Sequence, residues 1–423
     1  MIDQKRENLL NLALAATEVE RRRVPELSAG YNSYSKTWEV IVQYQGDLAF
    51  LEEQGVRVTL LLFSYAILLV PESLMDYVTG LPQITYLEKP KLLYFVFSDA
   101  FVRSISCITP VQEGVMGLSG NGVLLACIDS GVDYAHPDFC APDGTSRIAI
   151  LWDQTIPGNP PMGYALGSVY TRQQINEALA SSTPEERFAL VPSRDVTGHG
   201  TAVLGIAAGN GRSSADAAMR GVAPEATLVV VKLGNPDPAD LPRTSQLLQA
   251  VDFCVRYALL VERPLVTNLS FGNNYGSHSG DSLLETYLNA VSNLGQNVIC
   301  IGAGNEGDTG RHYAGNLKSD RKSSGQTQTV RATSDPAATS AVSATADRAV
   351  SVEFQVGAYE SSFSLQIWKV YGDEISIELI SPGGIRSGTL SPVLGTARLT
   401  LGPTELLLFY GMHPPTARRR KFT

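Results

Sequence analysis

Long hydrophobic runs, paired cysteines and an excess of positive charge are all missing from this 423-residue sequence. Its longest apolar stretch, residues 59–70, is too short to span a bilayer and predicts two buried strands instead. The net charge of −9 argues against nucleic acid as the main partner. We therefore expect neither a membrane nor a nucleic acid among the partners of this protein.

The cysteines do not suggest a disulfide framework, because the five are widely spaced and none forms a C-x-x-C pair. Cys127 and Cys300 lie inside apolar runs, which predicts that both are small residues of the core. We therefore expect that the protein lies in a reducing compartment or that its fold does not depend on disulfides. Residues 1–23 have a basic start and a short apolar centre, but polar interruptions favour an amphipathic helix over a signal peptide.

Metal and nucleotide sites have little support in the sequence. The five histidines are scattered, and neither an H-E-x-x-H motif nor a zinc-type Cys/His spacing occurs. Asp133 and Asp138 lie near each other, but surface turn positions explain them better than a calcium site. The glycine-rich stretch 117–122 precedes a predicted strand, whereas a dinucleotide fingerprint follows one, and no P-loop is present. We therefore expect no metal and no cofactor.

The pattern of hydrophobic residues changes along the chain and predicts four segments. Residues 1–95 follow the order β-α-β-β-α-β, which is typical of a ferredoxin-like α+β unit. Residues 96–324 alternate near-continuous apolar strands with helices, which predicts an α/β fold: a parallel sheet with helices on both faces. Residues 325–410 alternate with period two, which predicts a partial β-sandwich or jelly-roll, with one strand at 361–370. Residues 411–423 form an irregular basic tail.

Polar residues at the ends of the predicted parallel strands are the candidates for chemistry, because function collects at that edge of such sheets. Asp129 directly follows an apolar strand, and Gly131 frees the turn behind it. Taken alone, Asp129 is better explained as a helix-cap or turn residue. His199 makes a catalytic role for Asp129 the better explanation, because it lies between two glycines at the start of a predicted helix of small residues. A carboxylate on one ring nitrogen would make it a general base.

Two further stretches follow in the chain. Asn305, in GAGNEG after a predicted strand, can donate its amide to a developing oxyanion, although a turn asparagine is the plainer explanation. The stretch NLSFGNN predicts an exposed strand edge that pairs with an extended peptide, although an ordinary strand end is the plainer explanation. The residues of this candidate substrate edge are Ser270, Phe271 and Gly272.

In this order, the stretches IDSGVDYAHPDF, GHGTAVLGIAAG, GVAPEATLVVVK, NLSFGNN and GAGNEG resemble the subtilisin-like serine proteases. The resemblance implies a polypeptide substrate. It also implies that Asp129 orients the imidazole of His199, that His199 is the general base and that Asn305 stabilises the oxyanion. It also implies that residues 1–95 are a propeptide that occupies the cleft. The β-rich region and NLSFGNNYGSH are similar to the clostridial spore-germination subtilases, which favours a cytoplasmic or spore-associated location over secretion.

The family's nucleophile, a serine in Gly-Thr-Ser at the start of a helix, is missing after Asn305. Gly-Thr-Ser occurs once, at residues 144–146, and runs into a strand-like sequence, so Ser146 is predicted to be a turn residue. Ser391 is a poor candidate because Pro392 follows it. Two hypotheses stay open: a truncated, inactive serine endopeptidase, which we favour, or a pseudoprotease that binds peptides as a sensor or regulator. Truncation predicts an exposed apolar groove where the missing helix would pack.

Overall fold

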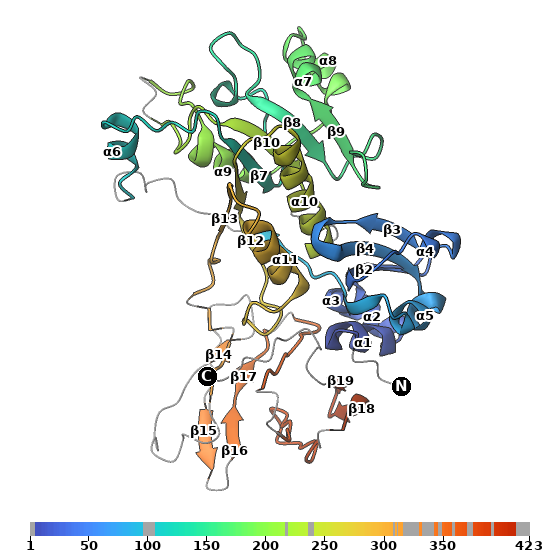
Figure 1. Ribbon diagram of the computed structural model, residues 1–423. Helices are drawn as coiled ribbons and strands as arrows, with labels where there is room; N and C mark the ends of the chain where they lie inside the picture. The colour runs from blue at the N-terminus through green and yellow to red at the C-terminus, as the bar shows by residue number, and fades with distance from the viewer. Residues whose placement is uncertain are drawn as a thin grey trace, which may run out of the picture.

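The computed structural model describes residues 5–95, 106–215, 219–235, 241–307, 309–310, 312–315, 330–331, 342–345, 349–357, 360–369, 375–390 and 393–411. Figure 1 shows three parts: a small N-terminal α+β unit, a larger α/β core and a group of C-terminal β-strands. Within the described ranges, no helix is both long and apolar enough to cross a bilayer. The predicted fold class, an α/β core preceded by an α+β unit, is confirmed.

The N-terminal unit is an antiparallel sheet with helices packed against it. Its strands are β1 (Tyr31–Asn32), β2 (Thr37–Tyr44), β3 (Arg57–Leu60), β4 (Tyr65–Pro71) and β5 (Ile84–Glu88). Its helices are α1 (Asn8–Ala15), α2 (Glu18–Arg23), α3 (Pro25–Ser28), α4 (Phe50–Glu53) and α5 (Met75–Gly80), with the 3₁₀ turns η1 (Leu62–Ser64) and η2 (Glu72–Leu74). β2 lies between β5 and β4, and β3 pairs with β4, which gives the predicted ferredoxin-like order β5-β2-β4-β3.

Alternation along the strands gives this sheet two apolar faces. In β2, Trp38 and Val40 point to one face and are buried among the helices of the unit. Ile41 points to the other face and joins the core of the α/β part, together with Ile67 and Tyr86. The sheet is therefore covered by its own helices on one side and by the α/β core on the other.

A mainly parallel six-stranded sheet forms the centre of the α/β core (Figure 1). Its strands are β7 (Leu124–Asp129), β8 (Ile148–Asp153), β9 (Ser168–Thr171), β10 (Thr227–Lys232), β11 (Leu265–Leu269) and β13 (Asn297–Ile301). The order is β13-β11-β7-β10-β8-β9, and every neighbouring pair is parallel except β8 with β9. The carboxyl ends of the parallel strands therefore meet at one edge, as the apolar runs predict.

Helices cover both faces of this sheet. α9 (His199–Ala208) packs on one face against β7, and α10 (Thr244–Leu260) and α11 (Leu283–Ser292) pack on the other. The remaining helical segments are α6 (Ile108–Glu113), α7 (Arg172–Leu179), α8 (Pro184–Leu190) and the 3₁₀ turn η3 (Pro137–Phe139). α10 and α11 also contact β2 of the N-terminal unit, so these two helices lie between the two sheets.

One face of the edge strand β13 is uncovered within the described residues. Val298 and Cys300 point to this face and are exposed, Val298 by 54%, whereas Ile299 points the opposite way and packs against the core. Cys127 is a core residue as predicted. The prediction that Cys300 is also buried is wrong, because no described helix covers this face of β13 and the thiol is exposed. The exposed apolar groove that truncation predicts stays a prediction.

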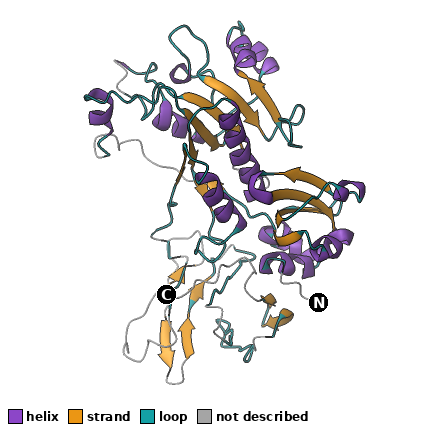
Figure 2. Cartoon of the chain, in the orientation of Figure 1, coloured by secondary structure: helices purple, strands orange, loops and turns teal. Residues whose placement is uncertain are grey.

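The C-terminal part consists of short strands and loops in its described residues, as Figure 2 shows by colour. The strands are β14 (Val330–Arg331), β15 (Val342–Thr345), β16 (Ala349–Val352), β17 (Phe354–Gln355), β18 (Gly395–Leu401) and β19 (Thr404–Tyr410). β15 with β16 and β18 with β19 are antiparallel pairs, whereas β14 with β17 is a parallel pair. The predicted strand at 361–370 is wrong, because residues 361–369 form none. The jelly-roll and the segment boundaries stay predictions, and the tail from residue 412 lies outside the described residues.

Candidate active site

Asp129 is the last residue of the central strand β7, so it lies at the middle of the sheet edge where the parallel strands end. The residue is 1% exposed. Gly131 follows with a φ of 115°, and a Cβ there would lie 3.0 Å from the carbonyl oxygen of Arg194. The glycine therefore lets the chain turn sharply beside the loop that leads to His199.

His199 is the first residue of α9, and the glycines on either side of it are needed for different structural reasons. Gly198 precedes the helix with a φ of 76°, a left-handed conformation that favours glycine. Gly200 lies so close to the turn after β7 that a Cβ there would be 2.1 Å from the carbonyl oxygen of Gly131. Without a side chain at this position, the first turn of α9 rests against the end of β7 and brings the imidazole to Asp129.

The structure brings His199 and Asp129 together as a buried pair. Nδ1 of His199 lies 2.6 Å from Oδ1 of Asp129, and each side chain is 1% exposed. Oδ2 of Asp129 is also buried and has no hydrogen-bond partner among the described residues. Burial raises the pKa of Asp129 above its ordinary value, while hydrogen bonds from His199 and the Ser130 N–H act in the opposite direction. A carboxylate on Nδ1 fixes the tautomer and leaves Nε2 as the basic nitrogen, which is what a general base needs.

A second carboxylate, that of Asp195, organises the loop between β7 and α9, and the sequence analysis missed it. Its Oδ1 accepts from the Ser130 hydroxyl at 2.9 Å and from the Gly198 N–H at 3.0 Å. Its Oδ2 accepts from the N–H and the hydroxyl of Thr201 at 2.8 and 2.7 Å. Burial acts to raise the pKa of Asp195, but these hydrogen bonds outweigh it and hold the pKa below its ordinary value. Its place four residues before His199 is the available sequence signal.

The candidate substrate edge is paired with a strand of the same chain. β12 (Phe271–Gly272) forms an antiparallel pair with β6 (Tyr94–Phe95), which follows the N-terminal unit. On the other side of this segment, the N–H of Leu93 donates to the carbonyl oxygen of Pro242 at 2.8 Å. Residues 92–95 therefore lie as the middle strand between two segments of the core, in the way an extended peptide binds.

Asn305 and Ser270 lie at the same edge of the sheet as Asp129. Asn305 is exposed and follows β13 by four residues. Ser270 directly follows β11, and its hydroxyl accepts from the side-chain amide of Asn268 at 2.9 Å. Because these strands run parallel, their carboxyl ends share one edge. The roles assigned to Asn305 and to residues 270–272 stay predictions.

Ser146 is not the predicted turn residue itself, because it follows the turn at 142–143 and forms an isolated antiparallel bridge with Cys140. It is 3% exposed, its N–H donates to the side chain of Asn176 at 2.8 Å, and its hydroxyl accepts from the Ile148 N–H at 3.1 Å. These bonds fix the turn just before β8. The other serine considered, Ser391, lies outside the described residues.

Metal-binding side chains do not gather in the part of the chain that the structure describes: no three His, Cys, Asp or Glu residues there are placed to share an ion. Asp133 accepts from the Ala135 N–H at 3.1 Å, which is typical of the predicted turn residue. The prediction of a surface position for Asp138 is wrong, because the residue is 6% exposed. Its carboxylate is turned inward to accept the Ser213 N–H at 2.7 Å.

Two protein-family models match the chain. The model of the Csp protease B prodomain matches residues 4–91, and the model of the subtilase family matches residues 120–404. The second match covers more than half of the chain, which therefore belongs to the subtilase family.

Individual relatives agree with this assignment. The major intracellular serine protease of Bacillus subtilis is 28% identical over 207 residues, which are 49% of this chain and 50% of that protein. Subtilisin E of the same species is 25% identical over 229 residues, which are 54% and 46% of the two chains. The chain spans about half the length of the curated relatives it matches. Among solved structures, the CspB protease of Clostridium perfringens is similar, with a TM-score of 0.56, 26% identity, and coverage of 74% of this chain and 57% of that chain.

Proposed function

We propose that this chain is a subtilisin-type serine endopeptidase in a form without its nucleophilic serine, so that the 423 residues alone hydrolyse polypeptides negligibly. The observation that carries the proposal is the buried pair of His199 and Asp129, with Nδ1 and Oδ1 2.6 Å apart. It lies at the same sheet edge as Phe271–Gly272, which pair with an extended segment. A base oriented in this way suits attack on a bound peptide carbonyl.

The proposed chemistry assigns one task to each group. In a longer counterpart that carries the serine, His199 Nε2 takes the proton of its hydroxyl as the oxygen attacks the scissile carbonyl, and then gives the proton to the leaving amine. Asp129 orients the imidazole and stabilises the positive charge that it gains. The Asn305 amide donates to the oxyanion. Water, deprotonated by His199, then releases the acid product and restores the serine.

Two observations support a truncated form whose longer counterpart supplies the serine. The sequence after Asn305 contains no Gly-Thr-Ser. In addition, Val298 and Cys300 on one face of β13 are exposed, Val298 by 54%, although the faces of a parallel sheet normally pack against helices. Loss of a triad serine reduces kcat by about 10⁶, and the remaining rate comes from binding and the oxyanion site.

Incubation of the purified chain with casein and with a fluorophosphonate probe tests the absence of activity. We expect no probe adduct on any serine by intact mass, and no more casein cleavage than with a His199→Ala variant purified in the same way. The variant controls for contaminating proteases. An adduct in the parent chain that is absent from His199→Ala would overturn the proposal.

The reading frames downstream of codon 410 test the truncation. Codons for Gly-Thr-Ser in another reading frame, preceded by codons for a predicted strand, support the truncation hypothesis. Restoration of that frame is then expected to produce casein hydrolysis that His199→Ala abolishes. Failure of the restored chain to cleave casein or to react with the probe would reject the endopeptidase assignment.

The absent serine also favours a second candidate, a non-catalytic sensor or regulator that binds peptides along residues 270–272. The similarity to the Clostridium perfringens CspB protease suggests spore germination as its setting. This candidate predicts a clean stop with no Gly-Thr-Ser in any frame, and tight binding of peptides without cleavage. Isothermal titration measures this binding. The reading-frame result distinguishes the two candidates, because neither form cleaves the peptide.

A further inference from the structure

Three buried ionisable residues form a row along the sheet edge, and the proposed chemistry uses only one of them. Asp129, Lys232 and Asp153 are the last residues of β7, β10 and β8, which are neighbours in the sheet (Figure 1). Their exposed fractions are 1%, 4% and 0%. Lys232 is in register with Asp129 on one side and with Asp153 on the other, so all three point to the face that α9 covers. The lysine therefore lies between two acidic residues.

The backbone that leads to His199 crosses this row and is tied to the strand ends beneath it. The Ser193 hydroxyl donates to Oδ2 of Asp153 at 2.6 Å. Nζ of Lys232 donates to the carbonyl oxygen of the next residue, Arg194, at 2.6 Å. Two neighbouring strands, β8 and β10, thus hold two consecutive residues of this backbone.

The residue after these two, Asp195, continues the series to the end of β7. Its Oδ1 accepts from the hydroxyl of Ser130, which directly follows β7, and from the N–H of Gly198, which precedes α9. Segment 193–195 therefore connects three adjacent strand ends to the helix that begins with His199.

The tie from Lys232 is the central one, and close packing surrounds it. A Cβ at Gly131 would lie 3.0 Å from the Cδ atom of Lys232 and 3.0 Å from the carbonyl oxygen of Arg194. The turn after β7 and the lysine stem thus cover this oxygen. A covered carbonyl oxygen that loses its donor is costly, so removal of the ammonium favours a shift of segment 193–195 away from the sheet edge.

We propose that Lys232 is a positioning residue for His199: its ammonium holds segment 193–195 over the sheet edge, and this segment places the imidazole for its hydrogen bond with Asp129. The inference rests on the proposed role of His199 as general base. Lys232 acts through the backbone, because its ammonium donates to a carbonyl oxygen. A charged group suits this buried position, because acidic residues end both neighbouring strands and compensate its charge.

The proton between Nδ1 of His199 and Oδ1 of Asp129 reports directly on this placement. In a short, buried hydrogen bond such a proton resonates at low field and is protected from exchange with water. Proton NMR of the full chain measures it, and its absence from His199→Ala assigns the resonance. We expect the resonance in the parent chain. We expect its loss in Lys232→Met, which keeps a stem of similar length but has no donor.

Lys89→Met is the matched control. Lys89 is 0% exposed, and its Nζ donates to the carbonyl oxygens of Glu26 and Pro90 within the N-terminal unit. The variant therefore removes the same kind of group from a different part of the chain, and we expect it to retain the resonance. Loss of the resonance in both variants would assign the change to general destabilisation and overturn the proposal.

Retention of the resonance in folded Lys232→Met also overturns the positioning role, although it leaves the general-base assignment intact. Absence of the resonance from the parent chain would overturn both, so the two failures are distinguishable. If circular dichroism shows that Lys232→Met does not fold, Ser193→Ala decides, because it releases the neighbouring tie of the same segment to Asp153. We expect its low-field proton to exchange with water several-fold faster than in the parent. Unchanged exchange would mean that these ties do not place the imidazole.

Discussion

Gly200 and Gly205 lie in the same helix, α9, but meet different surroundings. A Cβ at Gly200 would lie 2.1 Å from the carbonyl oxygen of Gly131, whereas no atom of the described residues comes within 4 Å of a Cβ at Gly205. We expect Gly200→Ala to lower the free energy of unfolding by about 1–3 kcal/mol through overpacking. Gly205→Ala is expected to raise it by up to about 1 kcal/mol through helix propensity. Urea denaturation measures both, and equal effects would contradict the close approach at Gly200.

Lys89 and Lys91 are two residues apart and both buried, yet their surroundings act in opposite directions. Burial lowers the pKa of Lys89 to about 7, because its ammonium donates only to backbone carbonyl oxygens among its described hydrogen bonds. Burial also acts to lower the pKa of Lys91, but ion pairs with Glu7 and Glu88 outweigh it and raise the pKa above its ordinary value.

The depressed pKa of Lys89 predicts a pH dependence of stability. Its contribution is fully present above the unfolded value of 10.5 and is lost as the pH falls through about 7. Within this range, stability declines by up to about 1.4 kcal/mol for each unit of falling pH. Lys89→Met has no titrating group, so we expect urea denaturation at several pH values in this range to lack that slope. Parallel curves for parent and variant would argue against a buried, titrating Lys89.

At the scale of elements, β13 has one packed face and one open face. Ile299 packs against the core, and its neighbour Val298 is 54% exposed. We expect Val298→Thr to change the free energy of unfolding by less than about 0.5 kcal/mol. Ile299→Thr is expected to lower it by about 1–2 kcal/mol, because packed methyl groups are lost and a hydroxyl enters an apolar site. Thermal unfolding measures both, and a comparable loss at the two positions would mean that the Val298 face is covered.

The sequence predicts an element well when the pattern of apolar residues within that element is enough to identify it. The continuous apolar runs of β7 and β10 reflect burial on both faces of their sheet, and the alternation of β2 marks the face that the helices of the N-terminal unit cover. Residues 361–369 alternate equally well but form no strand, because a strand also needs a partner, which local pattern does not specify. The prediction that Cys300 is buried is wrong for a related reason. The apolar residues beside it in the sequence do not show whether another element covers its face of β13.

At the scale of the whole molecule, contacts between distant residues decide what sequence can reveal. Asp129 and His199 are 70 positions apart, and only the resemblance of whole stretches to a known family joined them in the prediction. Asp195 escaped prediction because its partners are hydroxyl and backbone N–H groups. Such donors are common to almost every residue, so no residue type marks them before the chain folds.

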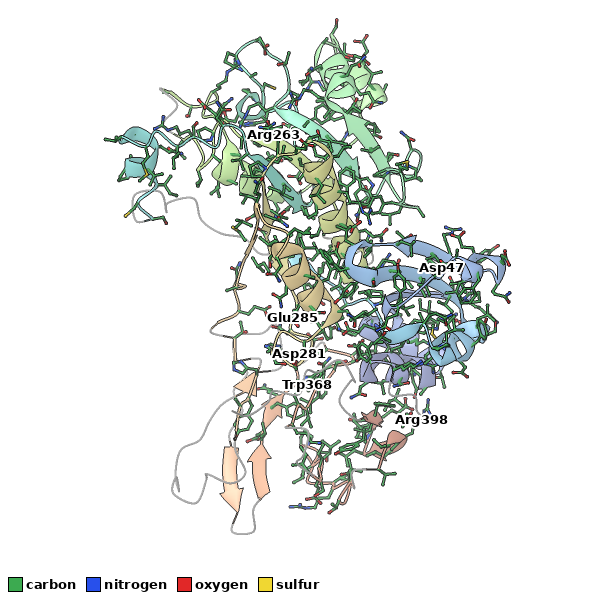
Figure 3. The ribbon with its side chains drawn as sticks, in the orientation of Figure 1. Asp47, Arg263, Asp281, Glu285, Trp368 and Arg398 are labelled. Atoms are coloured by element: carbon green, nitrogen blue, oxygen red, sulfur yellow. The ribbon has the colours of Figure 1, made fainter. Side chains whose placement is uncertain are left out.

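The C-terminal hairpin β18–β19 joins the chain's two ends. Figure 3 labels Arg398 on this hairpin, close to the N-terminal helices. Its guanidinium donates to the Glu20 carboxylate at 3.0 and 3.1 Å and to the carbonyl oxygen of Ala15 at 2.6 Å. The hydrogen bond with Arg398 is the main reason that the pKa of Glu20 is lowered to about 2.

Arg398→Gln is expected to weaken this contact only slightly and to speed exchange in α1 and α2 by no more than a few-fold, because both groups are partly exposed and screened by solvent. Since the Glu20 pKa is depressed, the stabilisation is present above pH 4.5 and is lost as the pH falls toward 2. Hydrogen exchange of peptides from α1 and α2 measures the loss. Arg386→Gln, which removes the exposed ion pair with Glu378, is the control and should leave α1 and α2 unchanged. Equal effects of the two variants would assign the change to net charge.

If residues 270–272 bind substrate as proposed, the pairing of β6 with β12 makes a peptide compete with residues 94–95 for the candidate substrate edge. Residues 94–95 are tethered to the surface they occupy, and a tethered segment acts as if dissolved at about millimolar concentration. A free peptide at micromolar concentration must therefore bind about a thousandfold more tightly to displace it. Peptide affinities measured on the intact chain will therefore understate the intrinsic affinity of Phe271–Gly272 by the ratio of the effective concentration to the segment's own dissociation constant, and they will rise once the tether is cut and the strand diffuses away.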